Sequence, residues 1–144
     1  MEKISDIMVK NIVTFKENDS ILDIAKKMGE KDIGCTIIVK GEKPIGIITE
    51  RDMVKRVVAK NLDLKKIKAK DIMTSPVESI NPESNIFYVN KIMREKGYKR
   101  YPVAKNGKLV GLVTQTDLID YFTEKRRKFV LSNLGKNLKN KYPV

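Results

Sequence analysis

The feature of this sequence that most constrains its fold is an internal repeat. Gly46-Ile-Ile-Thr-Glu-Arg-Asp52 recurs as Gly111-Leu-Val-Thr-Gln-Thr-Asp117, 65 positions later, and Asp6-Ile7-Met8 recurs as Asp71-Ile72-Met73 with the same shift. A fixed shift over some 50 residues is typical of two copies of one structural unit. A unit of roughly 55 residues is near the lower limit for a core of its own. We therefore expect the two copies to pack against each other.

The residue pattern of each copy predicts the same order of elements: an extended segment, a helix, two strands and a second helix. Extended segments are expected at Ile12–Thr14 and Val77–Ser79. The helices that follow carry apolar residues at the spacing of one helical face. Ser20 is a predicted N-cap for the first of them, and Gly97 is placed where a left-handed residue ends the second. These apolar residues are Ile21, Ile24, Ala25 and Met28 in copy one, and Ile86, Val89 and Met93 in copy two.

Two strands and a further helix complete each copy. Asn106-Gly107, between two apolar runs, is a strong hairpin signal. The predicted strands are Thr36–Val39, Ile45–Ile48, Tyr101–Ala104 and Leu109–Val113, and the second helices carry Met53, Val54, Val57 and Val58, then Leu118, Ile119 and Phe122. The expected fold is α/β (α+β), with two strand-helix-strand-strand-helix repeats packed through their sheets about a pseudo-twofold axis. The expected division is repeat one at 1–60, a polar linker at 61–70, repeat two at 71–122 and a basic tail at 123–144.

The composition excludes several classes of function. The chain has no histidine and one cysteine, Cys35, which excludes Ser-His triads, Cys-His dyads, the usual zinc sites and an internal disulfide. We see no clustered carboxylates for another metal and no nucleophile–base pair, and we expect no catalytic residues. No stretch approaches the 18–20 apolar residues, roughly, of a membrane span. The polar start does not resemble a signal peptide, so we expect a cytoplasmic protein.

The net charge of +12 is unevenly distributed. Residues 123–144 contain seven Lys/Arg and one Glu, which is half of the net charge. Leu131, Leu134 and Leu138 have helical spacing, interrupted by Gly135. One interpretation is that the last helix extends, with basic residues favoured near its end by the helix dipole. The alternatives are contact with nucleic-acid phosphates or with an acidic partner.

The repeated strand-to-helix junction is the candidate binding feature. A helix that starts directly after a strand leaves free amides that can hold a ligand. Asp52 and Asp117 could accept hydrogen bonds from the two hydroxyls of a ribose, and Thr49 and Thr114 offer hydroxyls for a phosphate. The alternative is that each Thr-x-x-Asp only caps its helix. Arg51 adds a cation to the first junction, and Thr116, the equivalent residue, adds a hydroxyl to the second.

The doubled order of elements, the Gly-h-h-Thr-x-x-Asp strand ends (h, apolar) and the Asp-Ile-Met starts resemble the cystathionine-β-synthase-type (CBS) domain pair. The resemblance covers about residues 1–122. It implies a stand-alone regulatory module that needs no cofactor. Such a module binds AMP, ADP, ATP or S-adenosylmethionine derivatives in clefts between the repeats and commonly forms disc-like homodimers. The ligand and the regulated protein are not specified.

By this resemblance, each site combines the Thr-x-x-Asp of one repeat with the extended segment of the other. Apolar residues there would sandwich adenine. Arg100 matches a phosphate-binding arginine of some members, which favours a phosphorylated ligand beside Asp117; the alternative is a solvated cation. Glu78 could repel a phosphate or accept a hydrogen bond from the adenine amino group, and Cys35 is expected to be a small core residue. One predicted site contains Asp117, Thr114, Thr116, Ile12, Val13, Ile33, Gly34, Cys35 and Arg100, and the other contains Asp52, Thr49, Arg51, Val77, Glu78, Tyr98, Lys99 and Arg100.

Overall fold

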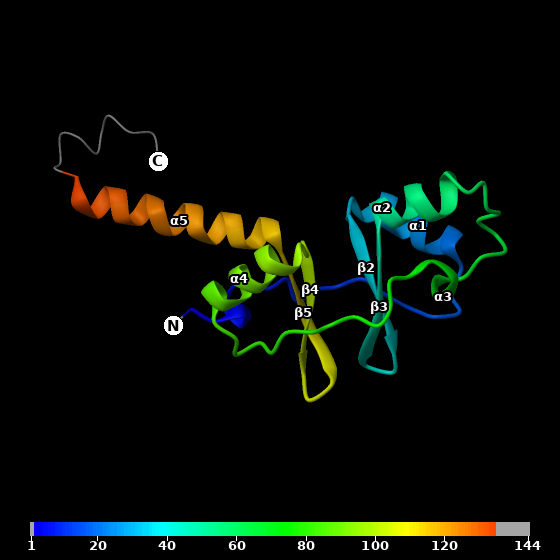
Figure 1. Ribbon diagram of the computed structural model, residues 1–144, viewed down its shortest axis with the longest axis horizontal. Coiled ribbons are helices and arrows are strands. Elements are labelled where there is room, and N and C mark those ends of the chain that lie inside the picture. The colour runs from blue at the N-terminus through cyan, green and yellow to red at the C-terminus, as the bar shows by residue number, and fades with distance from the viewer. Residues whose placement is uncertain (1, 135–144) are drawn as a thin grey trace.

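The computed structural model describes residues 2–134, which form two α+β halves side by side with one long helix projecting from the second half (Figure 1). The α+β class and the packing of the repeats through their sheets are confirmed. The elements, in order, are η1 (Ile4–Asp6), β1 (Thr14–Lys16), α1 (Ile21–Lys31), β2 (Cys35–Lys40), β3 (Lys43–Thr49), α2 (Glu50–Asp52), η2 (Met53–Val58), α3 (Ala69–Ile72), α4 (Ile86–Lys96), β4 (Arg100–Lys105), β5 (Lys108–Thr114) and α5 (Gln115–Asn133).

The predicted helix ends are confirmed at atomic detail. Ser20 Oγ accepts a hydrogen bond from the Asp23 N–H at 3.1 Å and so caps α1. Helix α4 ends at Gly97, which has a left-handed φ of 69° that glycine adopts without a Cβ penalty.

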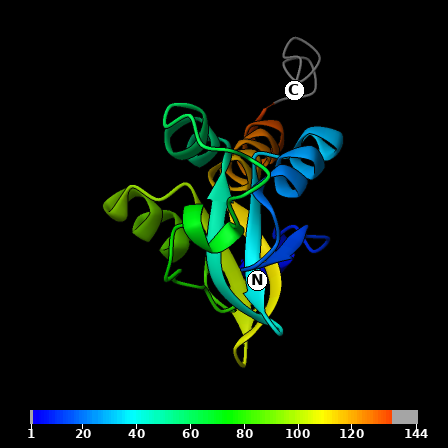
Figure 2. The same cartoon turned by 90° about the vertical axis from the view of Figure 1, so that its right-hand side faces the viewer.

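Each half contains an antiparallel hairpin with a two-residue turn, β2–β3 and β4–β5. Lys105 pairs with Lys108 across the second turn, and Asn106 and Gly107 both have positive φ, at 52° and 78°. This is the geometry that an Asn-Gly turn favours. The two hairpins lie against each other at the centre of the molecule (Figure 2), where the Leu109 N–H donates to the Glu42 carbonyl at 2.8 Å.

The extended segments differ between the halves. Strand β1 runs parallel to β2, and it begins at Thr14, the last residue of the extended segment predicted at Ile12–Thr14. In the second half Val77–Ser79 form no strand, and the equivalent pairing is one bridge in which the Ile80 N–H donates to the Pro102 carbonyl at 2.9 Å. The prediction of a full first strand is therefore wrong for repeat two, because only Ile80 reaches the edge of β4.

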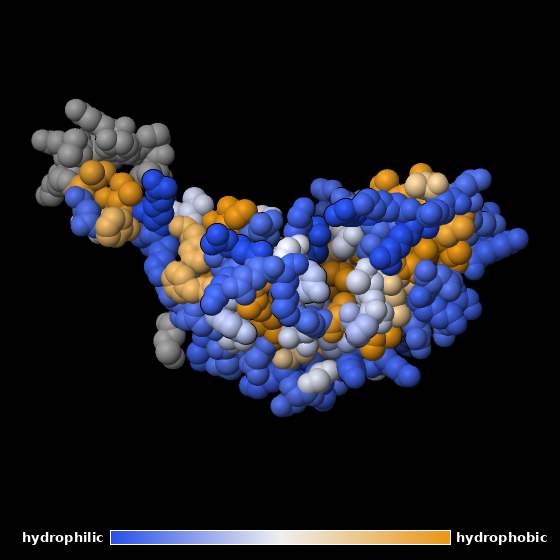
Figure 3. All heavy atoms as spheres, viewed as in Figure 1, coloured by the Kyte–Doolittle hydropathy of each residue, from blue (hydrophilic) through white to orange (hydrophobic). Residues whose placement is uncertain are grey.

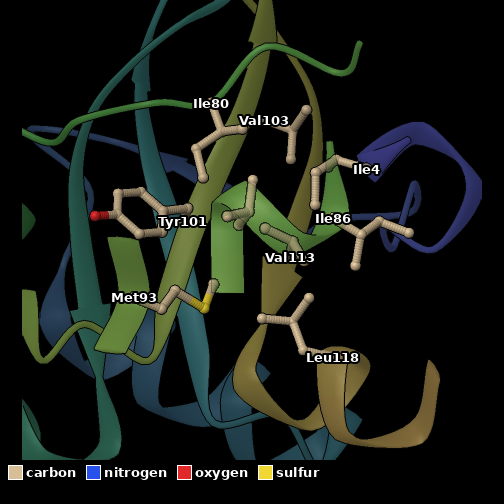
Figure 4. Close-up of a cluster of buried hydrophobic side chains, with 9 residues drawn as sticks. Ile4, Ile80, Ile86, Met93, Tyr101, Val103, Val113 and Leu118 are labelled. Atoms are coloured by element: carbon tan, nitrogen blue, oxygen red, sulfur yellow. The ribbon is translucent and has the colours of Figure 1, made fainter. Parts of the chain in front are cut away.

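Each half also receives the N-terminal segment of the other repeat. Ile4, from the start of repeat one, is fully buried in the core of the second half with Ile86, Val113 and Leu118 (Figure 4). Ile72, from the start of repeat two, is buried in the core of the first half. The two cores are thus built from exchanged segments, which sequence similarity alone does not show.

The exchange also includes the segment 61–70, expected as a polar linker. The Ile21 N–H donates to the Ile67 carbonyl at 3.0 Å, and Ala69 is fully buried in the first core. The second helix of repeat one, which precedes this segment, contacts α3, since the Arg56 guanidinium donates to the Ile72 carbonyl at 2.7 Å. That helix differs from the regular α-helix expected: after α2 it widens into the π-helical η2.

A close contact explains why the repeated motifs contain glycine and methionine. A Cβ added to Gly46 would lie 2.5 Å from the Met73 sulfur, and a Cβ added to Gly111 would lie 2.5 Å from the Met8 sulfur. The Met of each Asp-Ile-Met start therefore packs directly on the strand glycine of the other repeat. The Asp-Ile-Met motif of one repeat and the glycine motif of the other therefore form a contact, and this contact occurs twice in the molecule.

The basic C-terminal segment continues the last helix, as one interpretation predicted. Helix α5 runs for 19 residues, to Asn133. The Lys125 ammonium pairs with Glu2 and lies 4.7 Å from the centre of the Phe87 ring, and Arg127 pairs with Glu124 at 3.0 Å. Gly135 and Leu138 lie outside the described residues, and contact of the tail with nucleic acid stays a prediction.

We predict that Gly111→Ala destabilises the protein by about 1–3 kcal/mol, because the new methyl group overpacks the contact with Met8. The backbone carbonyl of Val9 is also only 3.1 Å from the added Cβ and cannot swing aside as a side chain can. The free energy of unfolding from urea titrations measures the effect.

The matched control is Gly29→Ala within α1, where nothing lies within 4 Å of an added Cβ. It should stabilise the protein by about 0.5–1 kcal/mol, since alanine favours a helix. Equal effects of the two changes would contradict the proposed contact.

Candidate functional site

Both Thr-x-x-Asp motifs form capping boxes where a strand runs into a helix. Asp52 Oδ2 accepts from the Thr49 N–H at 2.9 Å and from its hydroxyl at 3.1 Å, and Thr49 Oγ1 accepts from the Asp52 N–H at 3.2 Å. Thr114 and Asp117 make the same bonds at 2.8, 2.9 and 3.2 Å. The capping role left open by the sequence is thus present in both copies. It uses one carboxylate oxygen of each aspartate, and the other oxygen of Asp52 lies 3.6 Å from Nε of Arg56.

The larger of two cavities between the halves, here the Asp52 cavity, has a volume of about 760 Å³. This lies within the range of small-molecule sites. It combines the α2 cap of repeat one with the segments before β4 in repeat two. All the residues predicted for this site line it: Thr49, Arg51, Asp52, Val77, Glu78, Tyr98, Lys99 and Arg100.

The smaller cavity, here the Asp117 cavity, has a volume of about 320 Å³ and combines the α5 cap with segments of repeat one. Asp117 itself is not among its lining residues. Its Oδ2 atom is turned toward Thr114, where it accepts from the Thr114 N–H and from the Thr114 hydroxyl. The other predicted residues do line it: Ile12, Val13, Ile33, Gly34, Cys35, Arg100, Thr114 and Thr116.

Sequence reasoning missed several lining residues. Glu50 and Gln115 occupy equivalent positions, one at each junction, and each N–H donates to a loop carbonyl, that of Gly34 at 3.0 Å and that of Lys99 at 2.8 Å. The position within the repeated motif could have indicated this pair. Lys99 also lines both cavities, although it was predicted for only one. The others are Ile47, Thr74, Pro76, Gly97, Tyr101 and Pro102 in the Asp52 cavity, and Val9, Asn11 and Leu112 in the Asp117 cavity.

Figure 3 shows a hollow between the two halves, with apolar atoms on its floor and mainly polar atoms around its rim.

The charges of the two cavities differ. In the Asp52 cavity Glu50, Asp52 and Glu78 oppose Arg51, Lys99 and Arg100. The only charged residues that line the Asp117 cavity, among those the structure describes, are Lys99 and Arg100. The smaller cavity is therefore the more favourable one for an anion.

Glu78 is partly neutralised by an exposed partner. Its carboxylate lies 2.7 Å from Lys96, and this hydrogen bond raises the pKa of the Lys96 ammonium. The repulsion that Glu78 would exert on a phosphate is correspondingly reduced. Hydrogen bonding to an adenine amino group remains open to its second oxygen.

Cys35 is half-buried on the wall of the Asp117 cavity. Burial raises the pKa of its thiol, and the nearby Arg100 only partly opposes this. The thiol is therefore protonated near neutral pH and a poor nucleophile. Cys35 belongs to neither hydrophobic core, so the prediction of a core residue is wrong, while its predicted place at the binding site agrees with the cavity wall.

Two buried hydroxyls lie at equivalent positions of the repeats, Thr36 on β2 and Tyr101 on β4. Neither makes a hydrogen bond within residues 2–134, and both side chains are almost fully buried. Tyr101 lines the Asp52 cavity, and its hydroxyl points away from the hydrophobic cluster in Figure 4. Burial also raises the pKa of Tyr101, so this hydroxyl can donate as well as accept.

The start of the chain is held against α5 beside the Asp117 cavity. Glu2 accepts hydrogen bonds from the Tyr121 hydroxyl at 2.6 Å and from Lys125, and the first of these raises the pKa of Tyr121 to about 12. The N-terminal segment then runs past Val9 to the cavity wall. The same segment therefore touches both the cavity and the projecting helix.

Among residues 2–134, no group of His, Cys, Asp and Glu side chains is arranged to hold a metal ion. Within the same part of the chain, no helix is both long and apolar enough to cross a bilayer.

The fold is thus a tandem pair of exchanged α+β repeats with cavities between them. The model of the CBS domain matches residues 4–59 and again residues 69–124, so this chain belongs to the CBS-domain family and contains a tandem pair.

Curated relatives share the pair over most of the chain. YlbB of Bacillus subtilis (strain 168) is 33% identical over 139 residues, which are 94% of this chain and 93% of YlbB. Protein MJ0653 of Methanocaldococcus jannaschii is 46% identical over 116 residues, but the chain covers 60% of its length. The chain likewise covers only part of three other relatives. It spans 60% of MK0525 of Methanopyrus kandleri, 42% of MJ1225 of M. jannaschii and 33% of MJ1404 of the same organism.

Solved structures have the same fold. The CBS domain pair of protein MJ0100, in complex with 5′-methylthioadenosine and S-adenosyl-L-methionine, superposes with a TM-score of 0.77 at 29% identity, covering 87% of this chain and 98% of that one. A hexameric CBS-CP12 protein from bloom-forming cyanobacteria superposes with a TM-score of 0.74 at 29% identity, covering 82% and 70%.

Proposed function

We propose that this chain is a non-enzymatic regulatory module that binds an adenosine-containing ligand, an adenine nucleotide or an S-adenosylmethionine derivative, between its repeats. The observation that carries the proposal is that each cavity joins the capped helix start of one repeat to loop segments of the other. The complex of MJ0100 with two adenosine compounds supports the same ligand class.

The residues present suit the parts of such a ligand. In the Asp52 cavity the second oxygen of Asp52, which lies 3.6 Å from Nε of Arg56, has a further lone pair that can accept from a ribose hydroxyl. Val77 and Pro76 offer apolar surface to a base. In the Asp117 cavity Ile12 and Ile33 offer the apolar surface, and Arg100 and the Thr114 hydroxyl suit a phosphate. We therefore assign a phosphorylated ligand to the Asp117 cavity, where no lining carboxylate opposes it.

A ligand in the Asp117 cavity can alter the surroundings of α5. It would touch both the first residues of α5 and the segment at Val9–Val13, which is fastened to α5 through Glu2 and Tyr121. A regulatory signal requires that the ligand bind two arrangements of these elements with different affinity. The projecting helix is then the part of the module that a regulated partner would sense.

The proposal includes a homodimer formed by the second helices of the repeats. Val54 and Ile119 are equivalent residues on these helices, and they are 59% and 57% exposed; Val58 nearby is 72% exposed. These exposed apolar side chains lie at equivalent positions of the two repeats. They suit a symmetric contact in which the same surface of a second copy packs against this one.

We predict that Asp52→Asn weakens ligand binding in the Asp52 cavity by about tenfold or more, since a charge-assisted hydrogen bond contributes roughly 1.5–3 kcal/mol. Asparagine keeps one oxygen for the capping bonds. Ligand-dependent melting measures this: a ligand at 100 times its dissociation constant stabilises the native state by about 2.7 kcal/mol.

The panel is AMP, ADP, ATP, S-adenosylmethionine and 5′-methylthioadenosine, and Ser20→Ala is the control. That variant loses a helix cap worth about 1 kcal/mol at a site outside both cavities and should keep the full ligand-induced shift. Absence of a shift with every ligand in the panel would refute the proposal.

For the homodimer, we predict that the double variant Val54→Lys, Ile119→Lys sediments as a monomer while the native chain sediments as a dimer. Phe129→Lys is the control, since Phe129 is 67% exposed but lies far along α5. A native chain that is monomeric at tens of micromolar, or a double variant that stays dimeric, would rule out this interface.

A further inference from the structure

Lys99 and Arg100 lie on a wall that the two cavities share. They connect the end of α4 to β4, and both residues line both cavities. The backbone of this segment is held in place, since the Lys99 carbonyl accepts from the Gln115 N–H at 2.8 Å. The side chains are thus presented from a fixed point between the two sites.

The Arg100 guanidinium crosses from repeat two to repeat one. Its Nη2 atom lies 3.3 Å from the position that a Cβ on Gly34 would occupy, and Oε2 of Glu50 lies 4.0 Å from the same position. The absence of a side chain at Gly34 therefore leaves the space through which Arg100 reaches the smaller cavity. Glu50 also lines the larger cavity, as Arg100 does.

Repeat one supplies no equivalent cations. The residues 65 positions before Lys99 and Arg100 are Gly34 and Cys35. Among the described residues, the Asp117 cavity has no lining cation besides the shared pair. The Asp52 cavity adds only Arg51, against three lining carboxylates. An anion in the Asp117 cavity must therefore draw on Lys99 and Arg100, and an anion in the Asp52 cavity has the same two side chains together with Arg51.

We infer that Lys99 and Arg100 form a shared cation pair that couples the two cavities, so that a nucleoside phosphate in one cavity lowers the affinity of the other for a second nucleoside phosphate. The inference rests on the proposed function and extends it from ligand class to regulation. Uncharged adenosine compounds do not compete for the pair. The module thus holds one phosphorylated and one uncharged adenosine ligand more readily than two phosphorylated ones.

Calorimetric titration of the full chain with AMP and, separately, with adenosine tests this coupling. Adenosine should fill two sites per chain without antagonism. AMP should bind one site per chain, with the second site at least tenfold weaker relative to the first than it is for adenosine; couplings of this size are common between linked sites. Two AMP sites without antagonism would overturn the inference.

Variants identify the pair as the cause. Arg100→Gln should weaken the tighter AMP site about tenfold or more and change adenosine binding less than twofold. Cys35→Arg gives repeat one the missing arginine and should strengthen the second AMP site, which reduces the antagonism. Arg51→Gln is the matched control, because Arg51 lines only the Asp52 cavity, and it should leave the antagonism in place.

The outcomes separate this inference from the proposed function. If both probes bind and Arg100→Gln leaves the two AMP steps unchanged, the shared pair is refuted and the ligand class stands. If adenosine also fills only one site, a single cavity operates and the coupling is refuted. If neither AMP, adenosine nor the rest of the nucleotide panel binds, the proposed function itself fails.

Discussion

The structure depends on one contact made twice, a methionine from the start of one repeat packed on a strand glycine of the other. Met8 lies on Gly111, and Met73 lies on Gly46, with no room for a Cβ on either glycine. Because each contact crosses between repeats, neither half has a complete core by itself, as the burial of Ile4 and Ile72 in the opposite halves also shows. The exchange fixes the relative position of the halves and hence the two cavities between them.

The same exchange explains why the candidate sites are composite. The chain that follows Met8 passes the Leu112 backbone and then forms one wall of the Asp117 cavity, and the chain that follows Met73 pairs with Ile47 and forms one wall of the Asp52 cavity. The opposite wall in each case is a helix start with its capping threonine. A ligand bound in such a cavity therefore contacts both repeats, which gives it a means to alter their relative arrangement.

Much of this could be predicted from the sequence, because its signals are local or repeated. The caps at Ser20 and Gly97 and the Asn106-Gly107 turn each follow from the chemistry of one or two residues. The exchange of segments could not be predicted from the sequence. The repeat pattern is identical whether the N-terminal segment of each repeat packs on its own half or on the other half. The π-helical turn after Asp52 also has no signal in the apolar pattern, which fits a regular helix equally well.

For the site, repetition identified the Thr-x-x-Asp junctions, and the family resemblance indicated their partners across the cleft. The shared position of Lys99 and Arg100 depends on the path of one side chain past Gly34, which no spacing rule describes. The measurement that tests the central claim most directly is an amide NMR titration of the chain with AMP and 5′-methylthioadenosine. We predict chemical-shift changes on both walls of a cavity together, at Ile12–Val13 with Thr114–Thr116 or at Val77–Glu78 with Thr49–Asp52. Changes confined to residues 123–134, or none at all, would contradict a ligand cleft between the exchanged repeats.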